Sequence, residues 1–127
     1  MSASYSIDVE PWGFLRFTLE GFFDPETFQR FARDRDAAFA KLTCAPNAHL
    51  TLVDVTQCQL QSQEVAAAFQ KLMSDPHTRS RRIAFVFGAS PTRLQVRRIA
   101  AHRDDVGLFN EETSAMAWLR EPEARVA

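Results

Sequence analysis

The chain has 127 residues, of which 46% are hydrophobic and 24% are charged, and its formal net charge is −1. This length suits one ordinary domain with a single core, and the slightly acidic balance argues against a general nucleic-acid binder. The longest uninterrupted apolar run, residues 83–87, is far shorter than the roughly 18 to 20 residues of a membrane-spanning helix.

Residues 5–22 predict two strands joined by a tight turn at residues 11–13. In the second strand, apolar side chains alternate with polar ones, which is typical of a strand with one face in water. A long amphipathic helix follows, because Asp24 can cap its N-terminus and Pro25 suits the first helical position. Phenylalanines at helical spacing extend this helix to a stop before residues 45–47.

The middle of the chain alternates between buried strands and a helix. Residues 49–55 and 82–88 are β-prone runs of the kind that is buried on both faces of a sheet. Between them lie a polar loop and a helix that is expected to begin at Ser62 and to stop near Asp75.

The last third of the chain predicts two more helices and a short strand. Ser90 followed by Pro91 marks the start of a helix that reaches about His102. Residues 106–109 form the short strand, and Asn110 is expected to cap the final helix.

The order of elements is therefore ββαβαβαβα, which predicts an α/β fold. Its sheet should be mixed but mainly parallel, with four or five strands and about four helices, and the two N-terminal strands should form the antiparallel part. Residues 1–127 are interpreted as a single domain in which residues 121–127 form a flexible tail.

Three segments carry a likeness to a known family: HLTLVDV with the loop and helix after it, RIAFVFG, and VGLFNEETSAMAWL. Together they resemble the anti-sigma-factor-antagonist family (SpoIIAA-like, STAS). The likeness is strongest to its small single-domain bacterial branch, which is related to SEC14-like lipid-binding domains. The resemblance covers nearly the whole chain. It implies a SpoIIAA-like fold with helices mainly on one face of the sheet, and a role in binding rather than catalysis.

In the regulatory proteins that the chain resembles, a strand ending in Asp or Asn leads to an Asp-Ser-Ser-Gly type motif, whose serine a partner kinase phosphorylates. Aligning Asp54 with that strand end places Gln63 at the phospho-acceptor position, between Ser62 and Glu64. Glutamine cannot accept a phosphate. The resemblance therefore predicts a member of the fold that lacks the phosphoserine switch.

The polar side chains around the loop after residues 49–55 form the candidate partner-binding loop: Asp54, Thr56, Ser62, Gln63 and Glu64. Loops that follow buried strands often carry function in α/β proteins. Ser62 also has a structural interpretation as a helix N-cap, although a phosphate at that position would suit the helix N-terminus. Asp54 also has a structural interpretation, in which its carboxylate accepts hydrogen bonds from loop N–H groups in an Asx-turn.

The second half of the chain is the basic half, and residues 77–103 hold seven arginines without any Asp or Glu. Arg93 and Arg97 lie one helical turn apart on the predicted helix, and with Arg98 they form a candidate anion-binding site. The structural alternative is a solvated charged face that neighbouring acidic residues neutralise.

No catalytic, metal or cofactor site is predicted. The three histidines lie on separate elements, no HExxH or CxxC spacing occurs, and residues 88–92 match neither a nucleophile elbow nor a phosphate loop. Cys44 and Cys58 are interpreted as reduced thiols. The N-terminus has no apolar signal core, so a cytoplasmic location is expected.

Eleven phenylalanines are many for this length, and most are expected in the core. If they do not close the first helix fully against the sheet, an apolar pocket results. The leading interpretation is a non-enzymatic cytoplasmic interaction and regulatory module with a protein partner. The alternative is a binder or sensor of a small apolar or lipid-like ligand with an Arg-rich anion-contacting surface. Nucleic acid is not expected as a partner, and an exposed sheet edge would permit a homodimer.

Overall fold

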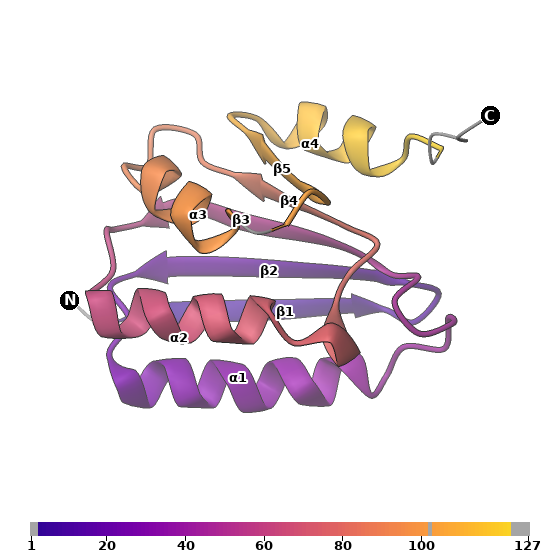
Figure 1. Cartoon of the computed structure of the whole chain (residues 1–127), viewed down its shortest axis with the longest axis horizontal. Coiled ribbons are helices and arrows are strands. Elements are labelled where there is room, and N and C mark those ends of the chain that lie inside the picture. Colours follow the sequence, from indigo (N-terminus) through magenta and orange to yellow (C-terminus); the bar gives the residue numbers. More distant parts are fainter. Residues whose placement is uncertain (1–2, 102, 123–127) are drawn as a thin grey trace.

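The computed structural model describes residues 3–101 and 103–122. Its five-stranded sheet has the strands side by side in chain order (Figure 1). The first two strands pair antiparallel, and every other neighbouring pair is parallel. The elements are β1 (Ser4–Glu10), β2 (Phe14–Gly21), α1 (Pro25–Phe39), β3 (Leu50–Cys58), α2 (Gln63–Met73), the 3₁₀ turn η1 (Pro76–Thr78), β4 (Arg82–Val86), α3 (Arg93–Ile99), β5 (Val106–Phe109) and α4 (Glu112–Leu119). The predicted order and mixed sheet are confirmed.

The helices form two layers of unequal size. α1, α2 and α3 connect neighbouring parallel strands and pack on one face of the sheet, whereas α4 follows the last strand and packs on the other face, against β3, β4 and β5. A right-handed crossover places its helix on the same face each time that the chain steps one strand in the same direction. α4 makes no crossover, so it is free to cover the opposite face. None of the described helices is long and apolar enough to cross a bilayer.

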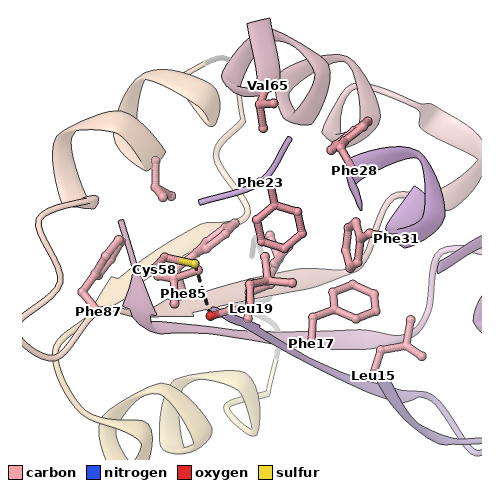
Figure 2. Close-up of a cluster of buried hydrophobic side chains, with 14 of the residues drawn as sticks. Leu15, Phe17, Leu19, Phe23, Phe28, Phe31, Cys58, Val65, Phe85 and Phe87 are labelled. Atoms are coloured by element: carbon pink, nitrogen blue, oxygen red, sulfur yellow. Dashed lines mark hydrogen bonds between the residues drawn. The ribbon is translucent and has the colours of Figure 1, made fainter. Parts of the chain in front are cut away.

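Phenylalanine rings build the core between the sheet and the three crossover helices, as the sequence predicts. Phe31 of α1 meets the rings of Phe17 and Phe23 edge to face, with centroids 5.6 and 6.4 Å apart. Phe69 of α2 contacts both Phe23 and Phe31. Figure 2 shows Phe17 and Leu19 pointing from β2 towards these rings. Edge-to-face packing adds about 0.5–1.5 kcal/mol per pair to the free energy of burial.

Two predicted helix starts are confirmed by their caps. The Asp24 carboxylate accepts the N–H of Thr27 at 2.7 Å, with Pro25 in the first turn of α1. The Ser62 hydroxyl accepts the N–H of Val65 at 3.1 Å at the start of α2.

Two other predicted caps are wrong. α3 begins at Arg93 rather than beside Ser90, whose hydroxyl instead donates to the Cys58 carbonyl at 2.9 Å. α4 begins at Glu112, and the Asn110 side chain accepts a hydrogen bond from Arg93 at 2.9 Å. In both cases a tertiary contact, to the end of β3 or to the start of α3, uses the polar group that the local pattern assigned to a cap.

Three predicted boundaries also change. β3 runs to Cys58 rather than ending at residue 55, because its parallel pairing with β2 continues past a register shift to the end of β2. β4 ends at Val86. α3 ends at Ile99, and the predicted end near His102 falls outside the described residues, as do residues 123–127 of the predicted tail.

Candidate functional site

Four loops lie at the edge of the sheet where the parallel strands end, and we call this region the carboxyl edge. It comprises residues 22–24, 59–62, 87–92 and 110–111. In open α/β sheets, ligands and partners often bind here, because the strands hold the loops while leaving their sequences free to vary. The predicted partner-binding loop belongs to this edge only in part.

The structure does not bring the five predicted loop residues together. β3 extends to Cys58, so Asp54 and Thr56 lie within the strand rather than after it. The valines that alternate with them face the crossover helices, and the two polar side chains therefore point to the α4 side of the sheet. The other three begin α2 on the opposite face: Ser62, Gln63 and Glu64.

Asp54 makes the local bond that its structural interpretation predicts. Its Oδ1 accepts the backbone N–H of Thr56 at 2.9 Å. On the neighbouring strand, a hydrogen bond to Glu112 of α4 raises the pKa of Arg16, and the charge of Asp54 adds to that effect. Asp54 therefore belongs to a charged group on the α4 face.

At the start of α2, the Ser62 hydroxyl is engaged as the cap, while Gln63 and Glu64 are exposed. The negative charge of Glu64 in the first turn is favourable beside the positive end of the helix dipole. Ser62 and Glu64 thus have structural roles at the helix start, Gln63 is exposed, and the assignment of all three to partner binding stays a prediction.

Gln61 is the central residue of the carboxyl edge, and the sequence analysis missed it. Its Oε1 accepts the N–H of Phe23 at 2.7 Å, and its Nε2 donates to the Gly21 carbonyl at 3.0 Å. Its backbone N–H and carbonyl both bond the side-chain amide of Gln95 in α3, at 2.9 Å each. We call this arrangement the Gln61 bridge, and it ties together the segments after β2 and β3 and the helix α3. A lone glutamine in a polar loop gives no sequence signal for such a role.

Three large apolar side chains are exposed next to the Gln61 bridge. Phe22 is 40% exposed, Leu60 53% and Leu94 64%. Each is the chain neighbour of a residue in the bridge, so the three are held at the same edge.

The three predicted anion-binding arginines lie on α3 and are exposed. Arg93 bonds the Asn110 side chain and stands over the Phe87 ring, 5.5 Å from its centroid. Arg97 and Arg98 extend into solvent from the same helix. None of the three lines the cavity described next, and anion binding by them stays a prediction.

An apolar cavity of about 90 Å³ lies between the sheet and the crossover helices. Its walls are mainly aromatic and aliphatic side chains of the phenylalanine core, several of which Figure 2 labels. At the carboxyl end, Gln61 and Gln95 line it; at the amino end it reaches Arg35 and Arg103. The pocket that the sequence allowed for is therefore present.

The amino end of the cavity carries a buried polar cluster. Thr51 and Ser80 share a hydrogen bond of 2.6 Å between their hydroxyls, and Ser80 Oγ lies 3.0 Å from His49 Nε2. Burial lowers the pKa of His49 to about 4, and the charges of Arg35 and Arg103 add to that shift. His49 is therefore neutral at pH 7.

Arg35 has a signal in the sequence, although it is not among the predicted site residues. Phe28 and Phe31 define the buried face of α1, and residue 35 continues that stripe at helical spacing. An arginine in an apolar stripe is uncommon, because a buried charge needs a partner.

The thiols and acidic groups offer little chemistry. The Cys58 thiol donates to the Leu19 carbonyl at 3.2 Å (Figure 2), and burial raises its pKa to about 12. It is therefore a poor nucleophile. Among the described residues, no three His, Cys, Asp or Glu side chains are grouped as a metal site.

No protein-family model matches the chain, and no curated protein matches it in sequence. Two solved structures resemble it over nearly its full length. One is an uncharacterised protein from the DUF3478 family with a SpoIIAA-like fold, from Shewanella loihica; the TM-score is 0.68 at 20% identity, over 93% of this chain and 94% of that one. The other is an anti-sigma factor antagonist from Mycobacterium paratuberculosis, with a TM-score of 0.59 at 15% identity, over 94% of this chain and 95% of that one. This protein therefore has the SpoIIAA-like fold that its sequence pattern predicted.

Proposed function

We propose that the protein is a non-enzymatic regulatory module that binds a protein partner through its carboxyl edge. The observation that carries this proposal is the group of exposed apolar side chains around the Gln61 bridge: Phe22, Leu60 and Leu94. Clustered exposed apolar residues mark interaction sites. Because the bridge fixes the loops beforehand, binding would lose little conformational entropy.

A binding role fits the chemistry of the described residues better than catalysis does. The Ser80–His49 contact is buried and is held from the other side by Thr51. A histidine with a pKa of about 4 is a weak general base at neutral pH. The contact is best explained as a satisfied polar cluster in the core.

The absence of a phosphoserine switch is part of the proposal. Ser62 already uses its hydroxyl to cap α2, and Gln63 occupies the position that corresponds to the phospho-acceptor in the resembling proteins. The fixed charge of Glu64 supplies a negative group at the same helix end. Replacing Ser62 by Asp, which also caps helices well, should leave partner binding unchanged.

The similar solved structure named as an anti-sigma factor antagonist makes an anti-sigma factor the first partner to test. Leu60→Ser and Leu94→Ser should each weaken binding of that partner at least tenfold, measured by calorimetry with purified proteins. Trp12→Ser is the matched control, because Trp12 is 64% exposed, as Leu94 is, but lies in the turn at the opposite edge of the sheet.

If Leu60→Ser, Leu94→Ser and Trp12→Ser all lose the same affinity for the partner, general surface apolarity, and not the carboxyl edge, drives binding. Loss of binding with Asp54→Ala, but not with the leucine variants, would move the interface to the α4 face. Light scattering of the same samples measures whether the free protein is a homodimer, as an unpaired β1 edge would permit.

A second candidate function is the binding of a small apolar ligand, and the cavity is the observation that favours it. Its 90 Å³ lie within a wall of phenylalanine, leucine and valine side chains, the environment in which apolar ligands replace empty space. Native mass spectrometry of protein purified from its own cells should then show an added mass that disappears on denaturation. A single ligand-free mass under gentle conditions would count against this function.

A further inference from the structure

Two arginines line the amino end of the cavity, and they differ in how their charge is balanced. The Arg103 side chain is 4% exposed and forms two hydrogen bonds to the carboxylate of Asp105. A paired arginine and carboxylate of this kind neutralise each other. The guanidinium of Arg103 is therefore already occupied.

Arg35 is buried almost as deeply, with 9% of its side chain exposed, but it has no comparable partner. Its Nη2 donates one hydrogen bond, to Thr78 Oγ1 at 2.9 Å. The carboxylate of Asp36 lies 3.6 Å from Nη1, beyond hydrogen-bonding distance, and that side chain is 70% exposed. A guanidinium has five N–H donors, so most of those of Arg35 lack an acceptor among the described residues.

The unused donors of Arg35 face accessible space. Within the described part of the chain, no fully buried side-chain nitrogen or oxygen lacks a hydrogen-bond partner. Arg35 lines the cavity together with three residues that carry hydroxyl groups: Thr51, Thr78 and Ser80. A ligand in the cavity would therefore meet both the charge and these hydroxyls.

The charge of Arg35 is only partly balanced by its surroundings, since Asp36 and Asp75 act on it without a hydrogen bond. Its guanidinium stands over the Phe39 ring, 4.5 Å from the centroid. Burial lowers the pKa of Arg35 to about 10, because the guanidinium loses part of its hydration. The ring offsets part of the lost hydration, and a hydrogen-bonded anion would offset much more of it.

We propose that the cavity binds a small apolar monocarboxylate, with its carboxylate on the Arg35 guanidinium and its hydrocarbon among the phenylalanine rings. The inference rests on the second candidate function, ligand binding. The planar guanidinium fork matches the two oxygens of a carboxylate. A single negative charge suits this end of the cavity, because Arg35 is the lining arginine without a hydrogen-bonded carboxylate, whereas Arg103 bonds Asp105, which Arg79 also contacts.

The volume sets the size of the ligand. A cavity of about 150 Å³ is large enough to hold benzene, so 90 Å³ suits a smaller hydrocarbon, of roughly three to five carbons. In a series of straight-chain carboxylates, affinity should rise about fourfold with each methylene until the cavity is full. Beyond that length it should level off.

Calorimetry with hexanoate tests the assignment, using protein that has been unfolded and refolded to remove any bound molecule. Arg35→Met should lower the affinity for hexanoate about ten- to hundredfold, because a charge-assisted hydrogen bond is lost while the side-chain volume is kept. Arg33→Met is the control, since Arg33 lies on the same helix, is exposed and does not line the cavity, and it should leave the affinity unchanged. Hexanol, which lacks the charge, should bind wild type and Arg35→Met equally.

The outcomes distinguish failure of the Arg35 assignment from failure of the second candidate function, the binding of a small apolar ligand. Equal hexanoate affinity of wild type and Arg35→Met overturns the Arg35 assignment while leaving ligand binding intact, as does hexanol binding without hexanoate binding. Failure of every chain length and of hexanol overturns both. Thermal melting checks that Arg35→Met folds. If it does not, Ile83→Phe places a larger side chain in the cavity wall and leaves residue 35 unchanged, and unchanged hexanoate binding to that variant overturns the inference.

Discussion

The two ends of the cavity differ in how their polar groups are satisfied. At the carboxyl end, Gln61 uses its side-chain amide and its backbone N–H and carbonyl in hydrogen bonds that join three parts of the chain. At the amino end, Arg35 makes one hydrogen bond and has no bonded carboxylate. A satisfied polar group explains how a fold is held, whereas an unsatisfied one indicates where something else binds. The same contrast separates Arg35 from its neighbour Arg103.

The largest expected change in stability tests the contrast between Arg35 and Arg103. Asp105→Asn should lower the free energy of unfolding by about 3–5 kcal/mol, because it leaves the buried charge of Arg103 without a partner. Asp104→Asn is the control, since the Asp104 side chain is 98% exposed, and its effect should be about 0.5 kcal/mol or less. Urea denaturation measures both. If the two variants lose similar amounts of unfolding free energy, Asp105 does not stabilise the buried charge of Arg103.

The polar cluster at the amino end should also make stability depend on pH. The folded pKa of His49, about 4, lies below its ordinary value of 6.5, so the unfolded chain binds a proton more readily. Stability should therefore fall as the pH falls from about 6.5 to about 4, by on the order of 3 kcal/mol. His49→Gln should flatten this dependence, and His77→Gln, at an exposed site, should not. If the stability of His49→Gln still falls with falling pH in this range, the pH dependence arises from other groups.

Loss of the Gln61 side chain at the carboxyl end of the cavity should lower the free energy of unfolding. Gln61→Ala removes the partners of the Phe23 N–H and the Gly21 carbonyl and should cost about 2 kcal/mol of unfolding free energy. Exposed Gln63, two residues later, provides the matched control Gln63→Ala, with an expected change of about 0.5 kcal/mol or less. If the two glutamine variants unfold at the same urea concentration, the bridge does not hold the edge together.

The smallest expected effect separates capping from function at Ser62. Ser62→Ala should destabilise the protein by about 1 kcal/mol, because it removes the cap bond to Val65. Ser62→Asp should restore most of that stability. A large loss of partner binding in Ser62→Asp, with stability restored, would show that the hydroxyl itself is recognised.

Local patterns predicted the fold well because they reflect local physics. The alternation in β2, the doubly apolar β3 and β4 and the caps at Asp24 and Ser62 each depend on a few adjacent residues. The same reasoning failed at Ser90 and Asn110, whose side chains bond groups far away in the sequence. The type of each element was thus predictable from the sequence, while the exact helix starts depended on tertiary contacts.

The candidate site was less predictable for the same reason. Asp54 was expected in a loop, but pairing with β2 extends the strand past it and turns its side chain to the α4 face. Gln61 gains its role only when Gln95 from α3 is brought beside it. Arg35 alone carried a usable signal, a charge in an apolar helical stripe, and it marks the less satisfied end of the cavity.

The empty volume beneath α1 has a mechanical consequence. The volume decrease on unfolding scales with the internal void that is lost, and about 90 Å³ per molecule corresponds to at most about 50 mL/mol. Hydrostatic pressure should therefore unfold the empty protein readily, and any molecule that fills the cavity should raise the pressure at which it unfolds. The barostability of protein taken directly from its cells would thus report, without a label, whether the cavity is occupied there.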